Sequence, residues 1–165
     1  MRKELLLLIF IFCNTVQAQV NNLDILKALS KFNAGELIEA TRYDGWEPIR
    51  PTEEIEDGVA RSIQKFIYDQ DNEKQILKRT VVAYFDKGFK YVNTILISNN
   101  PRIKEVFTAE LLPYETENSN KDYRKYDDGY DRYFITQDFN TENEFYEEFK
   151  EQGGFQISIS QKLPL

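Results

Sequence analysis

A change in the spacing of apolar residues is the feature that most constrains how this chain folds. Leu23, Leu26, Leu29 and Phe32 recur at three-residue steps, which is the spacing of one face of a helix. From Trp46 onward the side chains alternate instead, as in a strand, where successive residues point to opposite faces. The clearest strand-like runs are residues 59–68, 76–85 and 89–98.

Short turns between these runs predict antiparallel pairing. Asp57-Gly58 is a strong signal for a two-residue hairpin loop, and Gly88 can adopt the positive φ of a short turn. Pro48 and Pro51 cannot donate to a sheet ladder. They therefore restrict residues 46–56 to an edge strand or an irregular strand.

The second half of the chain opens with another helix signal. Asn100 suits a helix cap and Pro101 suits the first turn, while Pro113 ends the run. The alternation of helical and strand-like periods predicts an α+β fold. We expect short helices over about 23–42 and 101–112, packed on an antiparallel β-meander.

The two halves of the chain echo one another. Two pairs of segments match: FIYDQD at 66–71 with FITQD at 134–138, and TILIS at 94–98 with QISIS at 156–160. This pattern favours a degenerate tandem repeat of helix plus sheet. We expect a first half at 19–100 and a second half at 101–165, which together form one compact unit.

The segment 142–151 gives conflicting signals. Thr141 and Glu144 form a capping-box pattern, which favours a helix. The repeat instead favours a strand followed by a turn at Gly153-Gly154, and we slightly prefer the strand.

Residues 1–18 have the three-part layout of a secretory signal peptide. A basic start at Arg2 and Lys3 is followed by an apolar run and then by Val16-Gln17-Ala18, a small-x-small cleavage pattern. The apolar run is too short to span a bilayer, which needs about 20 residues. We expect cleavage after Ala18, a mature chain of 147 residues without a membrane span, and a periplasmic or secreted location.

Composition excludes several chemistries. The sequence has no histidine, and its one cysteine, Cys13, lies within the expected signal. The mature chain therefore lacks the side chains of Ser–His–Asp and Cys–His catalysis and of the usual Cys/His zinc sites. No Gly-rich phosphate-binding loop occurs either. We expect no catalytic residue of these classes, no metal and no cofactor.

Net charge narrows the choice of partners. The chain has a net charge of −7, and removal of the signal leaves 19 basic and 27 acidic residues, or about −8. Such a chain repels nucleic-acid phosphates, so we expect no nucleic-acid partner. A cationic partner would be attracted, although the same charge also suits ordinary solubility.

A tyrosine-rich stretch, residues 120–134, is the most distinctive local feature. Its tyrosines are spaced as on one face of a helix, but Asp128-Gly129 is a type I′ hairpin signal in their midst. We expect a hairpin in which Asp127 faces Tyr130 and Arg124 faces Tyr133.

Two interpretations of this hairpin remain open. Its rings are either half-buried parts of a sheet or a recognition surface, because tyrosine gives contact area at low entropic cost. Tyr126 and Tyr130 flank the expected turn, so we expect their rings to be the least able to reach a core. The candidate partner-binding residues are Tyr123, Tyr126, Tyr130, Tyr133 and Asp128.

Two acidic clusters suggest metal sites only weakly. Asp69, Asp71 and Glu73 begin like a calcium loop, but a lysine stands where such a loop needs glycine. The second cluster consists of Asp127, Asp128 and Asp131. We interpret both clusters as solvated turns. A glycosidase-like carboxylate pair stays open, because the fold sets the distance between the two groups.

The general layout consists of a signal, short helices, Asp44-Gly45-Trp46 before the first strand and an aromatic-rich meander. In this it resembles the small uncharacterised exported proteins of Gram-negative bacteria. In plan it is also similar to tandem helix-plus-sheet inhibitor proteins, which bind enzymes through the sheet face. The second resemblance implies a non-catalytic binding or inhibitor-like module for a protein or glycan partner. The alternatives are a carboxylate-based hydrolase acting on envelope sugars and a structural envelope component.

Overall fold

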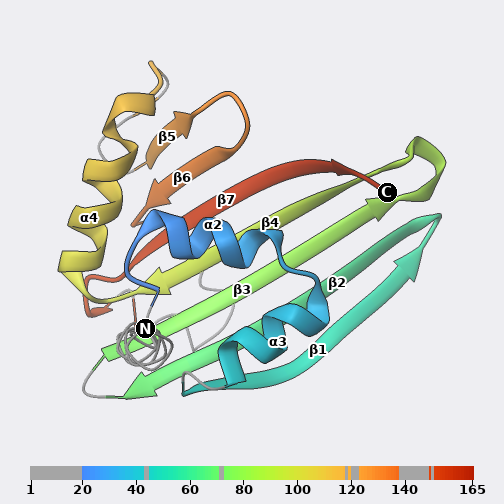
Figure 1. Ribbon diagram of the computed structural model, residues 1–165, viewed down its shortest axis with the longest axis horizontal. Helices are drawn as coiled ribbons and strands as arrows, with labels where there is room; N and C mark the ends of the chain where they lie inside the picture. Colours follow the sequence, from blue (N-terminus) through green and yellow to red (C-terminus); the bar gives the residue numbers. More distant parts are fainter. Residues whose placement is uncertain are drawn as a thin grey trace, which may run out of the picture.

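The computed structural model describes residues 20–42, 45–70, 73–117, 119, 123–137, 149 and 151–165. These residues form three α-helices and one open antiparallel sheet of seven strands, which confirms the predicted α+β class (Figure 1). The helices are α2 (Leu23–Lys31), α3 (Ala34–Arg42) and α4 (Pro101–Leu111). The strands are β1 (Trp46–Glu56), β2 (Val59–Gln70), β3 (Glu73–Tyr84), β4 (Phe89–Ser98), β5 (Tyr123–Asp127), β6 (Arg132–Thr136) and β7 (Phe155–Pro164). Two short 3₁₀ turns are η1 (Phe85–Lys87) and η2 (Leu112–Tyr114).

Side-chain caps fix where the helices begin. The Asn22 carboxamide oxygen accepts a hydrogen bond from the Ile25 amide at 2.9 Å, so α2 begins at Leu23. Asn33 and Glu36 cap α3 reciprocally, because each side chain accepts from the backbone amide of the other. Asn100 caps α4, and Pro101 occupies its first turn. The predicted helical regions are thus confirmed, with a break between α2 and α3.

The strand order is β1-β2-β3-β4-β7-β6-β5. Asp57 and Gly58 both have positive φ, 49° and 76°, and they join β1 to β2 in a two-residue loop, as predicted. The proline-containing β1 is the outermost strand on its side, and its register with β2 shifts between Ile49 and Thr52. The restriction of this segment to an edge is therefore confirmed.

The last strands of the two expected halves, β4 and β7, pair with each other, and from this junction the strands run outward in reverse chain order, four on one side and three on the other. Of the two matched pairs of segments, 94–98 and 156–160 lie on the paired strands β4 and β7, whereas the other pair does not occupy equivalent strands. Residues 66–70 lie in β2, which is separated from β4 by β3, whereas β6 lies directly beside β7. The match between 66–71 and 134–138 consists of an aromatic residue followed by polar residues near the end of a strand. Such a pattern is too common to identify equivalent strands.

The ambiguous segment 142–151 lies outside the described residues except for Phe149 and Glu151, which have helical backbone. The Gly154 amide donates to the Phe149 carbonyl at 2.6 Å, and Gly153 has a φ of 74°. This is the geometry of a helix C-terminal cap. The preference for a strand and a Gly-Gly hairpin turn is therefore wrong at these residues.

The two faces of the sheet differ in what covers them. The helices pack on one face, where Leu26, Leu37 and Phe107 join the main core with strand residues such as Leu77 and Leu96 (Figure 1). None of α2, α3 and α4 packs on the opposite side, and in this sense we call it the helix-free face. At one end of it, Phe149 packs on residues of β3 and β4.

No helix in the described part of the chain is long and apolar enough to cross a membrane. The expected signal at 1–18 lies outside the described residues.

Candidate recognition surface

The tyrosine-rich stretch forms a hairpin, but its register differs from the predicted one. Asp127 lies opposite Arg132 and Arg124 opposite Ile135, so residues 128–131 form a four-residue loop. A type I′ turn needs positive φ at Asp128. Among the described residues other than glycine, positive φ occurs at Asp57 and not at Asp128, so this turn does not form. The Asp128 carboxylate accepts hydrogen bonds from the Tyr130 and Asp131 amides instead, and these bonds hold the longer loop.

This register buries two of the candidate tyrosines. Tyr126 and Tyr133 lie opposite each other on the helix-bearing face, and both are 0% exposed. The expectation that Tyr126 could not reach a core is therefore wrong. Tyr130, at the loop, is 94% exposed. Tyr123 lies in β5 opposite Thr136, and its side chain is outside the described residues.

Asp128 joins the loop to α2. Its carboxylate accepts a hydrogen bond from the Tyr133 hydroxyl at 2.6 Å and pairs with Lys27 at 3.2 Å. Burial alone raises the pKa of Asp128, but the hydrogen bonds from Tyr133, two backbone amides and Lys27 outweigh it and hold that pKa well below its ordinary value. Burial and the bond to Asp128 raise the pKa of Tyr133.

The Asp131 carboxylate also makes a structural hydrogen bond, because it accepts from the Gln161 carboxamide at 2.8 Å. Within the described residues, no group of three or more carboxylates is arranged to hold a metal ion. Of the calcium-like pattern, Asp71 lies outside the described residues and Asp69 lies 3.9 Å from Lys74. Of the three candidate rings whose side chains the structure describes, Tyr126 and Tyr133 are buried and Tyr130 is open to a partner.

A different aromatic group is exposed on the helix-free face. The rings of Tyr84, Phe89 and Tyr91 lie with centroids 5.3 to 6.1 Å apart, at the opposite end of β3 and β4 from Phe149. Tyr91 is 41% exposed. Lys87 lies over the Tyr84 ring at 5.1 Å and Lys162 over the Phe89 ring at 4.1 Å, so two cations flank the cluster.

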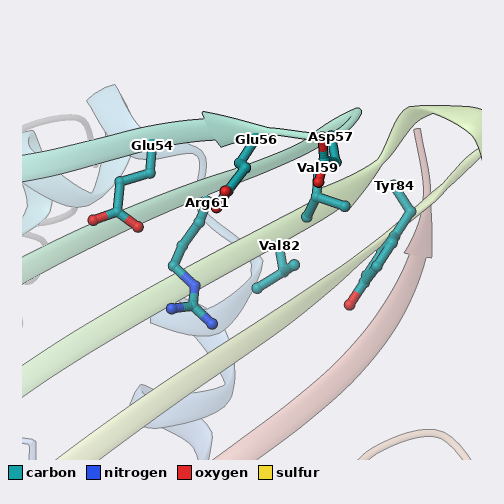
Figure 2. Close-up of a pocket in the computed structure, with 7 residues that line it drawn as sticks. All are labelled: Glu54, Glu56, Asp57, Val59, Arg61, Val82 and Tyr84. Carbon is teal, nitrogen blue, oxygen red and sulfur yellow. The ribbon is translucent and has the colours of Figure 1, made fainter.

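A groove of about 350 Å³ adjoins this cluster at Tyr84, and Figure 2 shows its lining side chains projecting from the β1–β2 hairpin and β3. Cross-strand pairing explains the arrangement. Glu54, Arg61 and Val82 form one row across three strands, and Glu56, Val59 and Tyr84 form the next. Asp57 completes the rim. We call the combined set the aromatic–acidic surface: Glu54, Glu56, Asp57, Val59, Arg61, Val82, Tyr84, Phe89 and Tyr91.

The groove has an excess of negative charge. Glu54, Glu56 and Asp57 are exposed, and Arg61 is the one basic side chain among the lining residues. None of these three carboxylates forms an ion pair with another residue in the described ranges. The groove can therefore receive a lysine or arginine side chain, with Tyr84 as an aromatic wall.

Sequence reasoning did not identify this surface. It placed Phe89 on a strand and Glu54 and Glu56 on an edge segment, but it could not say which face the helices leave uncovered. The triad Tyr84, Phe89 and Tyr91 lies on both sides of one short turn, but rings alone do not identify an uncovered face, because the helix-bearing side also carries several, such as Phe66 and Tyr68.

No family model, curated protein or solved structure matches this chain.

Proposed function

We propose that this protein is an exported, non-catalytic binding or inhibitor-like module that recognises a protein partner through the aromatic–acidic surface. The observation that carries the proposal is the continuity of the three-ring cluster with an acidic groove on the helix-free face. Rings at interfaces supply large contact areas at low entropic cost, and they dominate binding hot spots.

The chemistry of the surface favours a partner that presents basic side chains beside apolar ones. Three carboxylates without an ion-pair partner among the described residues line the groove, while Val59, Val82 and Tyr84 provide its apolar floor and wall. The net charge of about −8 of the mature chain would also accelerate encounter with a cationic partner. The partner is a protein of the envelope or exterior, consistent with the signal-like N-terminus.

Site-specific crosslinking tests this proposal. A photo-crosslinking residue at position 91 of the mature protein is expected to capture a partner from envelope extract. The same residue at position 114 is the matched control, because Tyr114 is also 41% exposed but lies on η2. Equal capture from both positions would contradict recognition through this surface.

Binding to the captured partner then gives the energetic test. Tyr91→Ala is expected to weaken binding by about 2 kcal/mol, as for an interface hot spot, while Tyr114→Ala has little effect. The double change Glu54→Gln, Glu56→Gln is expected to slow association, most clearly at low salt. A partner that binds all of these variants equally would show that another surface is used.

One observation favours a second candidate, a carboxylate-based hydrolase. Glu54 and Glu56 project into the same groove (Figure 2). Both are exposed, however, whereas the general acid of a glycosidase is usually shielded in an apolar pocket. Release of reducing ends from envelope glycans by the purified protein, abolished by Glu54→Gln or Glu56→Gln, would favour the hydrolase over the binding module.

A further inference from the structure

The outer edge of β1 lies beside the acidic groove. Among the described strands β1 is the outermost on its side of the sheet, and its residues 47–56 are all exposed (Figure 1). Glu54 and Glu56, which line the groove, belong to this same strand (Figure 2). A ligand that contacts these two glutamates therefore lies next to a sheet edge.

The register of the β1–β2 hairpin shows which backbone groups of this edge are directed outward. In a two-residue hairpin the residues that flank the loop form a hydrogen-bonded pair, which here consists of Glu56 and Val59. Hydrogen-bonded and non-hydrogen-bonded pairs alternate along an antiparallel ladder, so Glu53 and Ile55 belong to non-hydrogen-bonded pairs. Their N–H and C=O groups therefore point away from β2, toward the open edge.

Proline separates two parts of β1. Pro48 and Pro51 lack an N–H and lie before the register with β2 resumes at Thr52, so this part is poorly suited to pairing with another strand. Residues 52–56 contain no proline and pair with β2 without interruption. The part of the edge that can donate main-chain hydrogen bonds is therefore the part that carries the groove glutamates.

The side chains of this part alternate in chemistry. Glu54 and Glu56 lie on the helix-free face, whereas Ile55 lies on the other side of the strand and is 80% exposed. A strand added to this edge would place its own side chains alternately on the same two sides. The complementary segment therefore carries a basic, an apolar and a second basic side chain in succession.

We propose that residues 52–56 form the docking edge for an extended segment of the partner protein with this basic–apolar–basic pattern. Main-chain hydrogen bonds to Glu53 and Ile55 hold the segment as an additional strand, and the side chains on both sides of β1 provide specificity. This inference rests on the proposed function, because it describes how a partner of the aromatic–acidic surface binds.

A second copy of this chain is a poor occupant of the same edge. Two β1 strands paired antiparallel about Ile55 would set Glu54 of one copy opposite Glu56 of the other. Like charges directly opposite each other destabilise a strand pair. The acidic edge therefore favours a basic partner over self-association.

A synthetic peptide of alternating lysine and valine residues with capped ends is the probe for this edge. The control peptide has the same composition, with the lysines and valines in separate blocks. We expect the alternating peptide alone to give saturable NMR shifts of the Glu53 and Ile55 amides. It should also slow hydrogen exchange at both amides by about tenfold when about nine in ten molecules are bound, because both gain main-chain partners.

Two substitutions at one position separate main-chain from side-chain contacts. Ile55→Ala removes the apolar side chain but keeps the N–H, whereas Ile55→Pro also removes the N–H that points outward, a change that edge strands tolerate. Ile55→Pro is expected to bind the alternating peptide about three- to tenfold more weakly than Ile55→Ala, as for the loss of one hydrogen bond. If Ile55→Pro does not fold, the exchange measured in the wild-type protein decides.

The proposal is overturned if the two peptides bind equally, if exchange at Glu53 and Ile55 does not slow, or if the two variants bind the alternating peptide equally. Exchange at these amides that slows in the free protein as its concentration rises would show that the edge pairs with a second copy instead.

Failure of this inference can be told apart from failure of the proposed function. A partner captured from position 91 that binds Ile55→Pro and Ile55→Ala equally would keep the aromatic–acidic surface and reject the docking edge. An alternating peptide that binds at the edge, with no capture from position 91, would keep the edge and reject the surface.

Discussion

At the scale of single residues, Tyr126 and Tyr130 differ sharply in what they contribute. Tyr126 is 0% exposed and Tyr130 is 94% exposed. Tyr126→Ala is expected to destabilise the protein by about 3–5 kcal/mol, since it empties a core site. Tyr130→Ala should change stability by less than about 0.5 kcal/mol. Urea unfolding of the two variants checks this, and similar midpoints would show that the Tyr126 ring is not a core residue.

Asp128 makes stability depend on pH in a defined direction. Its pKa is lower in the folded than in the unfolded state, so its contribution is fully present above the unfolded value of about 3.9 and is lost as pH falls through the folded value. The free energy of unfolding of the wild type is expected to exceed that of Asp128→Asn by about 2 kcal/mol at pH 7, and this difference should shrink below about pH 4. A difference that stays constant from pH 7 to pH 3 would argue against a buried, hydrogen-bonded carboxylate. Asp127→Asn is the control, because its carboxylate is more exposed.

Residue spacing alone could not show which tyrosine ring is buried or that the Asp128 carboxylate is hydrogen-bonded. The Asp128-Gly129 pair indicates a hairpin, but a loop of four rather than two residues changes which residues face each other and therefore which rings are buried. The deciding interactions are the Asp128 bonds to the loop amides and to Lys27 on a distant helix. The bond to Lys27 joins residues far apart in the sequence and leaves no periodic signal.

At the scale of elements, the turn at Gly153-Gly154 shows how tightly one connection is built. A Cβ at Gly154 would meet the carbonyl oxygen of Phe149, whereas one at Gly58 would meet nothing within 4 Å. Gly58→Ala should cost about 1 kcal/mol, for its positive φ of 76° alone. Gly154→Ala is expected to cost more, because the backbone of the cap must move. Denaturant unfolding compares the two, and equal costs would contradict a close-packed cap.

Elements were predictable where local signals agreed. Apolar spacing predicted α2, the cap and proline signals predicted α4, and turn residues predicted the β1–β2 hairpin. The Gly-Gly segment was assigned to a hairpin because an apparent repeat was given more weight than a local capping pattern. A helix cap and a hairpin turn both favour glycine with positive φ, so composition alone does not separate them.

At the scale of the whole molecule, charge and fold class followed from the sequence, but the candidate surface did not. Its position depends on which face the helices cover, and that is settled by packing over the entire sheet. Export is the molecular property that can be checked most directly. We expect the mature protein to begin at Gln19 when its N-terminus is sequenced, and an intact Met1 on cytoplasmic protein would contradict this.

The position of β7 in the sheet has a consequence for how the chain folds. β7 follows β5 and β6 in the sequence, yet it lies between them and β4 (Figure 1). The β5–β6 hairpin therefore cannot join the first four strands until β7 has been synthesised. Until then β4 presents an unpaired edge, and closing it requires contacts between distant segments such as Thr94 and Ile159, which form slowly. A chain in which β1–β4 have formed before residues 155–164 are available would carry an open sheet edge, which is prone to pairing with other chains.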